Sequence, residues 1–595
     1  MTMEEGKRIG IDEYDVIIIS GDAYVDHPSF AAAIIGRVLW DAGFSVGIIA
    51  QPDWNNGSDF EKLGKPRLFF AITSGNVDSM VNHFAPSKKR RKKDQYSEGG
   101  IPKRPDRAAI VYSNIIRKLF PESAIIIGGI EASLRRLAHY DYWSDSVRQS
   151  ILADAPADIL VYGMGERQII EIAKSQDSMR NVKEIVQIGG TCEKTSIREW
   201  KNKDKSGIIE LPDYISVRDS TDEFARAFAM QYQENNPVKG RRVAQPHPKT
   251  VIIQNPPARP LSEEEIDHIF ELPFQREAHP SYKEKIPALE PVRFSITSHR
   301  GCYGECSFCA LANHQGRIIQ SRSRDSIIRE VKKITRHPDF RGTITDVGGP
   351  TANMYKSHCP RWSESGACSR TEKATCIGCP SLVGGDNEYL GLLTDLSAIR
   401  GVKHVFISSG IRYDLIRDEA FLRAICRNNI SGHLKVAPEH ISDNVTKTMN
   451  KPPRKAFDNF LEIFIRVGMK KPKKQYVLPY FMSGHPGCRI DDMVECAEYI
   501  RDRRLYTEQV QDFTPTPMTA STCMYHTGKD PFTGQKLYIP KGREKTIQRA
   551  MLHYRDHRNS KLVTEGLERS GRGDLIGNSP LCLVNSHYKK RREKR

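Results

Sequence analysis

The sequence lacks any long hydrophobic run. Its 595 residues are enough for two or more domains. No uninterrupted apolar stretch approaches the roughly 18 residues of a membrane span. The first residues, Met1 to Lys7, also lack the apolar segment of a secretory signal peptide. We therefore expect a cytoplasmic protein with no membrane partner.

The sequence also lacks an even number of cysteines. It has thirteen, and they gather in the middle of the chain. This distribution argues against an extracellular disulfide framework, which uses paired cysteines in small secreted domains. A reducing compartment is the expected environment.

Acidic residues are too few to balance the basic ones. Lysine and arginine number 90 against 73 aspartates and glutamates, which gives a formal net charge of +17. Excess positive charge attracts polyanions without deciding which one binds. Two runs, Lys88 to Lys93 and Lys589 to Arg595, hold much of it. Each is either a solvated loop or tail or a contact with nucleic acid, and the sequence leaves both interpretations open.

The chain is predicted to begin with a doubly wound α/β domain over residues 1–180. Short apolar runs alternate there with helical patterns, which is typical of parallel sheets built from βα units. A helix is predicted over Ser29 to Ala42. The predicted strands are Val16 to Ser20, Ser45 to Ala50, Arg67 to Thr73, Ser123 to Ile127 and Asp158 to Tyr162.

Residues 181–290 have a weaker pattern and are predicted to form a connector, with a helix over Glu263 to Glu271. A second α/β region is predicted over residues 291–520, with a helix over Ser323 to Arg336. Residues 521–595 are predicted as a basic extension with a helix near 541–558 and a disordered tail. The six strands predicted in the second region are Val292 to Thr297, Gly342 to Val347, His404 to Ser408, His433 to Ala437, Gln475 to Phe481 and Gln509 to Phe513.

Three cysteines follow the first of these strands, with three residues and then two between them: Cys302, Cys306 and Cys309. Thiolates are the usual protein ligands of iron–sulfur clusters, and three of them leave one iron of a cube open to a substrate or cofactor. The alternative is a partial zinc site or a group of buried thiols, although structural zinc favours four ligands.

This spacing, with an aromatic residue (Phe308) before the third cysteine, resembles the signature of the radical SAM superfamily. The resemblance implies a [4Fe-4S] cluster on Cys302, Cys306 and Cys309, with S-adenosylmethionine bound to the fourth iron. It also implies reductive cleavage of that cofactor to a 5′-deoxyadenosyl radical, which takes a hydrogen atom from an unknown substrate. A reductant protein such as a flavodoxin or ferredoxin would then be a partner.

The first domain resembles the cobalamin-binding-like domain that precedes many radical SAM cores. The resemblance is carried by two predicted strands that end in Gly128-Gly129 and in Gly163-Met164-Gly165-Glu166. The cobalamin ligand motif Asp-x-His-x-x-Gly is missing, because Asp26 and His27 are adjacent. We predict a turn at that position and no bound cobalamin.

Along the whole chain, the order of these features is similar to YgiQ-type radical SAM proteins, a family with only a class-level assignment. The resemblance implies a partial (βα)6 TIM-like barrel over residues 291–520, with its site at the carboxyl ends of the strands. It implies that the backbone of Gly348 and Gly349 holds the amino group of S-adenosylmethionine, although Pro350 replaces the usual glutamate, and that Gly484 lies near adenine.

Other side chains after these strands are candidates for cofactor contact. The resemblance places Glu439 at the ribose, and a carboxylate is suited to accept hydrogen bonds from paired hydroxyls. Glu439 could equally charge the start of the next helix. Ser408 and Ser409 are candidate polar contacts or solvated turn residues. His440 is a structural histidine or a proton carrier.

A second cysteine set lies in an insertion near residues 353–385: Cys359, Cys368, Cys376 and Cys379. Four thiols ending in CxxC are able to bind zinc or an auxiliary iron–sulfur cluster, and free thiols are the alternative.

The sequence therefore predicts a radical SAM enzyme of unknown substrate. Two other hypotheses stay open: an RNA-modifying, methylthiotransferase-like enzyme, and a non-enzymatic zinc-containing protein that binds nucleic acid.

Overall fold

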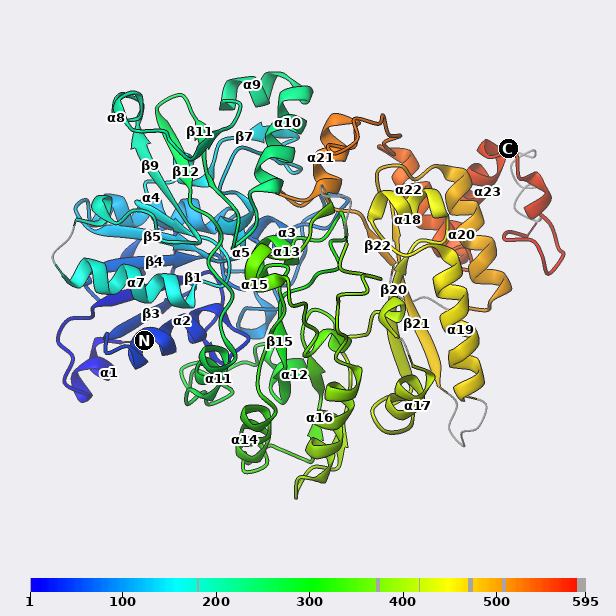
Figure 1. The fold of residues 1–595 in the computed structure, drawn as a ribbon, viewed down its shortest axis with the longest axis horizontal. Helices are drawn as coiled ribbons and strands as arrows, with labels where there is room; N and C mark the ends of the chain where they lie inside the picture. The colour runs from blue at the N-terminus through cyan, green and yellow to red at the C-terminus, as the bar shows by residue number, and fades with distance from the viewer. Residues whose placement is uncertain are drawn as a thin grey trace.

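A computed structural model describes residues 2–178, 181–370, 375–416, 418–468, 475–505 and 510–585. Its largest element is a nine-stranded sheet in the order β10-β11-β12-β9-β8-β5-β4-β1-β3, in the N-terminal half of the chain (Figure 1). The strands are β1 (Val16–Ser20), β3 (Val46–Ala50), β4 (Phe69–Thr73), β5 (Ala124–Gly128), β8 (Ile159–Val161), β9 (Thr191–Ser196), β10 (Ile208–Glu210), β11 (Arg242–Pro246) and β12 (Thr250–Gln254).

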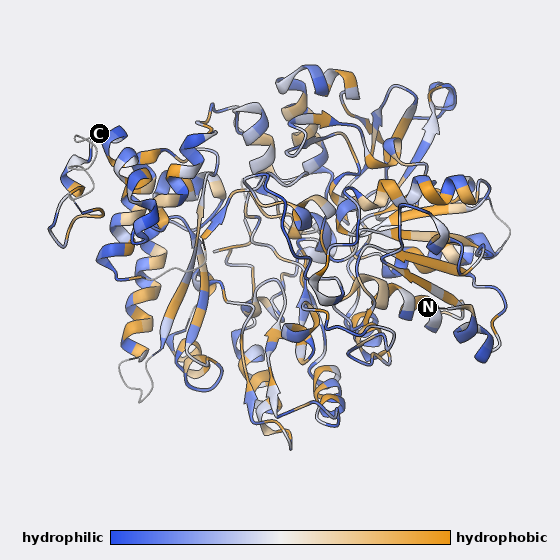
Figure 2. Ribbon diagram, turned by 180° about the vertical axis from the view of Figure 1, so that it is seen from behind, coloured by the Kyte–Doolittle hydropathy of each residue, from blue (hydrophilic) through white to orange (hydrophobic). Residues whose placement is uncertain are grey.

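The strands β3, β1, β4, β5 and β8 are parallel, and they confirm the predicted doubly wound arrangement. Alternate residues of β1 enter two different cores, Ile17 one and Ile18 the other. Helix α4 (Ala108–Leu119) covers the first face, while α2 (Ala31–Asp41) and α7 (Glu166–Asp177) cover the second. Both faces of these strands are therefore buried, and Figure 2 shows them in the orange of hydrophobic residues.

The predicted domain boundary at residue 180 does not separate two units. Strand β9 pairs antiparallel with β8, and β12 and β11 continue the same sheet. The outer half of β9 is exposed or half-buried, so its sequence carries no continuous apolar run, which is why the pattern weakened there. The helix predicted over Glu263 to Glu271 is present as α11 (Glu263–Glu271), and Ser262 and Glu265 form its capping box.

A buried histidine in the β11–β12 hairpin makes part of this sheet sensitive to acid. His247 is stacked on Tyr214, with ring centroids 5.7 Å apart, and neither ring nitrogen has a hydrogen-bond partner in the described part of the chain. Burial lowers the pKa of His247 to about 4, against the opposing charge of Asp213. Below about pH 6.5 the imidazole of His247 is protonated in the unfolded chain but not in the native state. The free energy of unfolding therefore falls as the pH drops from about 6.5 towards 4.

We expect His247→Phe to remove this loss. Between pH 7.5 and pH 5, the variant should keep about 2 kcal/mol of unfolding free energy that the wild type loses. Urea unfolding at the two pH values measures the difference. His268→Gln, at an exposed histidine paired with Asp41, is the control and should behave as the wild type does. An equal loss in His247→Phe and the wild type would show that this ring is protonated in the native state.

The second half of the chain has strands at all six predicted positions, as short parallel pairs in chain order, and the second predicted strand is divided into β17 and β18. β14 pairs with β18, β17 with β19, Ile411 bridges to Val436 of β20, and β20, β21 and β22 form one sheet. These are separate short sheets. The strands are β14 (Ser295–Thr297), β17 (Thr343–Ile344), β18 (Asp346–Gly348), β19 (His404–Val405), β20 (His433–Glu439), β21 (Tyr476–Ser483) and β22 (Val510–Asp512).

Some predicted limits were wrong. Val292 ends a short helix, α12 (Leu289–Val292), so the first strand starts at Ser295. The helix predicted over Ser323 to Arg336 is present as α14 (Arg324–Ile334), while Gln509 lies outside the described residues.

The C-terminal extension is folded as far as residue 585. Ile547 of α22 (Arg543–Leu552) and Leu567 of α23 (Ser560–Arg569) lie in the same core as Phe481 of β21. The predicted disordered tail and the run Lys589 to Arg595 lie outside the described residues. The run Lys88 to Lys93 forms an exposed loop, as predicted.

The other helices and short strands complete the element order. The helices are α1 (Met3–Arg8), α3 (Ser79–His83), α5 (Gly129–Leu134), α6 (Ile151–Asp154), α8 (Ile197–Asn202), α9 (Tyr214–Asp219), α10 (Thr221–Gln233), α13 (Leu311–Gln315), α15 (Trp362–Ser365), α16 (Asp386–Ala398), α17 (Glu419–Asn428), α18 (Asp443–Met449), α19 (Arg454–Gly468), α20 (Ile490–Asp502) and α21 (Ala520–Thr527). The strands are β2 (Val25–Asp26), β6 (His139–Asp141), β7 (Ser146–Arg148), β13 (Glu277–Ala278), β15 (His299–Arg300) and β16 (Gln320–Ser321). Every helix within the described ranges is too short or too polar to serve as a membrane span.

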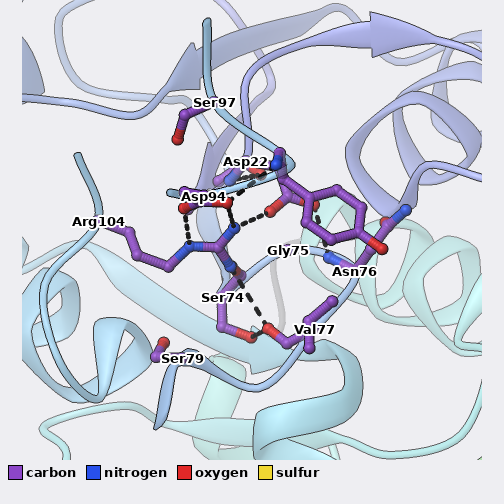
Figure 3. A network of polar contacts seen from close by, with 12 residues as sticks. Asp22, Ser74, Gly75, Asn76, Val77, Ser79, Asp94, Ser97 and Arg104 are labelled. Atoms are coloured by element: carbon purple, nitrogen blue, oxygen red, sulfur yellow. Dashed lines mark hydrogen bonds and ion pairs between the residues drawn. The ribbon is translucent and has the colours of Figure 1, made fainter. Parts of the chain in front are cut away.

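A buried ionic network joins the loops at the carboxyl edge of the large sheet (Figure 3). Arg104 donates to Asp22, which follows β1, at 2.6 Å, and to Asp94, near the basic loop, at 3.1 Å. It also donates to the carbonyl of Ser74, which follows β4, at 2.7 Å. All three charged side chains are almost fully buried. One guanidinium thus holds three loops together.

Candidate functional site

The three-cysteine loop begins where β14 and β15 end. Gly301 has a φ of +89°, and a Cβ there would lie 2.2 Å from the carbonyl oxygen of Ile318. Only glycine fits this turn without displacing backbone. The turn directs Cys302, Cys306 and Cys309 out of the β15–β16 pair and into a loop that several distant elements hold.

Contacts from α10 and α18 fix the loop. The carboxylate of Glu305 accepts hydrogen bonds from the Tyr232 hydroxyl at 2.6 Å and from Arg317 at 2.8 Å. The backbone N–H of Ser307 donates to the backbone carbonyl of Met449 at 2.9 Å. The hydroxyl of Ser307 donates to the backbone carbonyl of Thr448, also at 2.9 Å. The cysteines therefore sit on a rigid frame, although the loop itself contains no regular structure.

The three thiols are half-buried, and one guanidinium lies against the middle sulfur. Burial raises the pKa of Cys302, and that of Cys309 to about 12, so that neither would ionise readily without a cation to bind it. Arg412 supplies one positive charge: its Nη1 donates to Cys306 Sγ at 3.6 Å, while its other side forms an ion pair with Asp414 at 2.7 Å. Sequence reasoning missed Arg412, because no motif marks it.

The chemistry of the donor set fits a cluster. Thiolates are the usual protein ligands of iron–sulfur clusters, and each cysteine of a cube binds a different iron. Cys302, Cys306 and Cys309 supply three such donors on one loop, and the Arg412 guanidinium lies beside the middle sulfur. The residues present therefore fit the cluster that the sequence implied.

Gly348 and Gly349 lie beside this loop. A Cβ on Gly348 would meet the Ser409 hydroxyl at 2.3 Å, and one on Gly349 would meet the backbone oxygen of His299 at 2.6 Å. Both positions are therefore closed to other residues. Burial lowers the pKa of His299 to about 4, so this ring is neutral at the same place.

Ser408 and Ser409 are brought to the end of β18, but they are occupied with Asp346. The carboxylate of Asp346 accepts from the N–H of Ser408 at 2.7 Å and of Ser409 at 3.0 Å. The Ser408 hydroxyl donates to the carbonyl of Thr345 at 2.7 Å. In this structure the serines therefore organise the turn, which is the turn-residue role that the sequence left open.

Glu439 is the most unusual residue near the loop. It has a φ of +67°, in the left-handed region, where the register between β20 and β21 shifts. The residue is only 8% exposed. Burial raises the pKa of Glu439, while Lys451 and Arg412 oppose the rise. Backbone strain at a largely buried carboxylate is typical of a ligand contact.

Two neighbouring predictions have structural explanations. His440 is buried beside Met493, 3.3 Å away, and burial lowers its pKa to about 4, as a neutral structural histidine requires. The backbone N–H of Gly484 donates to Gln548 at 2.9 Å, and a Cβ there would meet Lys545 at 2.9 Å. Gly484 is thus committed to contacts with α22.

The large sheet contributes to the site through a buried ion pair. Arg300, two residues before Cys302, bonds to Glu166 at the start of α7 at 2.6 Å, and both side chains are at most 4% exposed. His314 of α13 also contacts Ser133 of α5 at 3.0 Å. Glu166 was noted in the sequence only as part of a strand end, and its partner could not be foreseen without the fold.

A cavity of about 560 Å³ lies between the two regions. It opens at the carboxyl ends of parallel strands, the usual place for a ligand in α/β folds. Its lining includes Thr73, Gly128, Gly163, Thr297, Asp346 and Gly348. The glycine-containing strand ends that the sequence singled out therefore face the same space as the Gly348-Gly349 turn.

His27 is fully engaged within the protein. Its Nδ1 accepts from the N–H of Ser29 at 3.0 Å, and its Nε2 contacts Arg276 at 2.9 Å. The segment thus forms a turn before α2, as predicted. The absence of bound cobalamin stays a prediction.

The second cysteine set lies next to the first. Cys359, Cys376 and Cys379 belong to one apolar cluster with Cys302 and Tyr303. The sequence placed these thiols in an insertion and gave no sign that the insertion folds back onto the three-cysteine loop.

Two family models match the chain. The model described as "Radical SAM N-terminal" matches residues 1–295, and the one described as "Domain of unknown function (DUF3362)" matches residues 508–595. Among solved structures, the radical S-adenosylmethionine methyltransferase TsrM from Kitasatospora setae is 14% identical with a TM-score of 0.49, covering 86% of this chain and 76% of that one. The cobalamin-dependent enzyme OxsB is 10% identical with a TM-score of 0.45, covering 88% and 57%.

Relatives of much higher identity extend over the full chain. A UPF0313 protein of Methanosarcina mazei is 52% identical and covers 100% of both chains. One from Methanocella arvoryzae is 53% identical over 98% of this chain and 97% of its own. A third, from Clostridium botulinum strain ATCC 19397, is 48% identical over 98% and 91%. The chain belongs to the UPF0313 (YgiQ-type) family of radical SAM proteins.

Proposed function

We propose that this protein is a radical SAM enzyme that cleaves S-adenosylmethionine and takes a hydrogen atom from a substrate still to be identified. The observation that carries the proposal is the half-buried loop of Cys302, Cys306 and Cys309 with Arg412 against its middle sulfur. The parallel strands from β14 to β22 would form the predicted partial barrel around it. We infer a [4Fe-4S] cluster on the three cysteines.

Bound there, the cluster supplies the electron that splits S-adenosylmethionine and yields the 5′-deoxyadenosyl radical. The residues of the chain bind and orient. Arg412 compensates negative charge at Cys306. Glu439 offers a carboxylate to the ribose hydroxyls, and the tight Gly348-Gly349 turn allows backbone contact with the amino group.

The test is the product of cofactor cleavage. Anaerobically reconstituted protein, reduced by dithionite or a flavodoxin, is expected to convert S-adenosylmethionine to 5′-deoxyadenosine and methionine, measured by liquid chromatography and mass spectrometry. Glu439→Gln, which keeps the shape and removes the charge, should raise the KM for S-adenosylmethionine about tenfold with less change in kcat. No 5′-deoxyadenosine from protein that holds a reducible cluster would contradict the proposal.

A second candidate, an RNA-modifying enzyme, is favoured by a cationic surface beside the site. Lys88 of the basic loop and Lys545 of α22 both lie over the ring of Tyr142, at 4.7 Å and 5.4 Å from its centroid. Lys545 also lies 5.7 Å from the ring of Tyr525. Lysines around aromatic rings suit phosphates and bases of single-stranded nucleic acid.

A row of rings connects this surface to the cysteine loop. Phe308, His485, Phe513, Tyr525 and Tyr142 follow one another with centroids 5.2 to 6.2 Å apart. Four successive ring contacts therefore link Tyr142, over which the lysines lie, to Phe308, the residue before Cys309. A polyanion held on them would reach towards the site.

We expect Lys88→Ala/Lys545→Ala to weaken binding of single-stranded RNA and to lower the slope of log Kd against log salt by about 2. Fluorescence anisotropy at several salt concentrations measures both. Lys332→Ala/Lys333→Ala, at two exposed lysines of α14, is the matched control and should change neither quantity. RNA binding that is undetectable, or that does not depend on salt, would rule out this candidate.

The remaining hypothesis, a zinc-containing protein that binds nucleic acid without catalysis, predicts colourless protein with zinc and no iron. Measurement of zinc and iron in the purified protein distinguishes it from the leading proposal.

A further inference from the structure

We propose that the second cysteine set, Cys359, Cys368, Cys376 and Cys379, holds an iron–sulfur cluster of its own beside the three-cysteine loop. This inference goes beyond the proposed function, since it would hold whatever the first loop does.

The four cysteines lie in a lobe that is closed at its base. His358 and Val383 form an antiparallel bridge, with backbone hydrogen bonds of 3.0 and 2.9 Å in the two directions. The described residues on the two sides of 371–374 therefore begin and end at the same bridge. Such a lobe is far too short to bury a core of its own, and segments of this size usually need a metal or disulfide crosslink.

Thiols contribute to the interior of the lobe. Cys376 is buried among the apolar side chains Trp362, Ala367 and Leu382, and Cys359 and Cys379 pack against the same cluster. All four cysteines are free, so no disulfide closes the lobe.

A buried donor lies in the same cluster as these thiols. The indole N–H of Trp362 is buried and makes no hydrogen bond of normal geometry in the described part of the chain. Cluster sulfurs accept such N–H groups, and those bonds help to set cluster potentials. A buried, unpartnered donor otherwise carries a free-energy cost.

Four thiolates are able to bind either one zinc or one cube, so the metal content of the protein decides between the two.

The two sets share a neighbour. Tyr303, next to Cys302, lies in the same apolar cluster as Cys376, and its ring is 6.0 Å from that of Trp362. Its hydroxyl donates to Ser357, just before the lobe, at 3.2 Å. A cluster in the lobe would therefore be separated from a cluster on the three-cysteine loop by little more than the side chain of Tyr303.

Iron analysis of separate variants tests the proposal. The full chain, reconstituted anaerobically with iron and sulfide, should hold about eight irons and as many sulfides, because each cube holds four. Cys302→Ala/Cys306→Ala/Cys309→Ala should keep about four, with the electron paramagnetic resonance signal of a reducible cluster. Cys359→Ala/Cys376→Ala should also keep about four. Cys582→Ala, at a cysteine outside both sets, is the control and should keep about eight.

The triple variant decides the matter even if the lobe variant fails to fold. About four irons in it would support a cluster on the second set, and none would overturn it. One zinc per chain that is lost in Cys359→Ala/Cys376→Ala would also overturn it. These measurements need no S-adenosylmethionine. Failure of the proposed enzyme activity would leave the iron counts unchanged, so it can be distinguished from absence of the second cluster.

Discussion

Cys306→Ala is expected to reduce 5′-deoxyadenosine formation by about 10³-fold or more, since a cube held by two thiolates would lose its fixed position and its place for the cofactor. Cys306 is the middle ligand of the loop and the one that Arg412 contacts. Product formation by anaerobic, reduced protein, divided by its iron content, measures the effect. Cys582→Ala, far along the chain, should keep full activity.

Arg412→Met gives a graded result at the same sulfur. Outer residues that bond to metal ligands typically contribute about 10- to 100-fold to activity or metal affinity. The variant should therefore lose activity by that factor and keep a cluster of lower reduction potential, because the buried positive charge near the sulfurs is gone. Spectroelectrochemical titration reports the potential. Wild-type activity and potential in Arg412→Met would show that the 3.6 Å contact has no electrostatic role.

Arg104→Met is expected to destabilise the protein by about 3 to 5 kcal/mol, the usual effect of removing one partner from a buried ion pair. The change leaves two carboxylates, Asp22 and Asp94, buried without a counter-charge (Figure 3). Burial already raises the pKa of Asp22 to about 6 with Arg104 in place. Urea unfolding, followed by fluorescence, measures the loss.

Two further variants separate charge from packing. Asp22→Asn/Asp94→Asn/Arg104→Met removes all three charges and should recover much of the lost stability. Arg218→Met, at an exposed pair with Asp219, is the control and should be as stable as the wild type. If the triple variant is as unstable as Arg104→Met, the hydrogen bond to Ser74 and the packing of the guanidinium, rather than charge balance, hold the loops together.

The sequence was most informative where strands are buried on both faces. β1 and β4 are continuous apolar runs because each side chain enters one of two cores, and their predicted ends differ from the observed ones by at most two residues. Strand β9 was not predicted, since only its first three residues are buried and the rest alternates with solvent. An antiparallel strand that is only half buried gives a weaker signal than a parallel strand that is buried on both faces.

The three candidate cluster ligands could be picked out from the sequence, whereas their surroundings could not. Cys302, Cys306 and Cys309 lie within eight residues, so their spacing is visible without the fold. Arg412 and Glu166 reach the loop from more than a hundred residues away, and no pattern in a single sequence links them to it. Glu439 was found through its resemblance to a family segment, whereas its strained backbone became visible only in the fold.

The ion pair between Arg300 and Glu166 means that the N-terminal sheet and the cysteine loop are one working unit. A fragment that began after the sheet would leave Arg300 with no partner and would open one wall of the cavity. Replacing the first region with that of a distant homologue should also leave Arg300 without a partner, unless the replacement carries a residue equivalent to Glu166. The strand order of the N-terminal region is that of a separate domain, yet the region forms part of the cavity wall beside the proposed site.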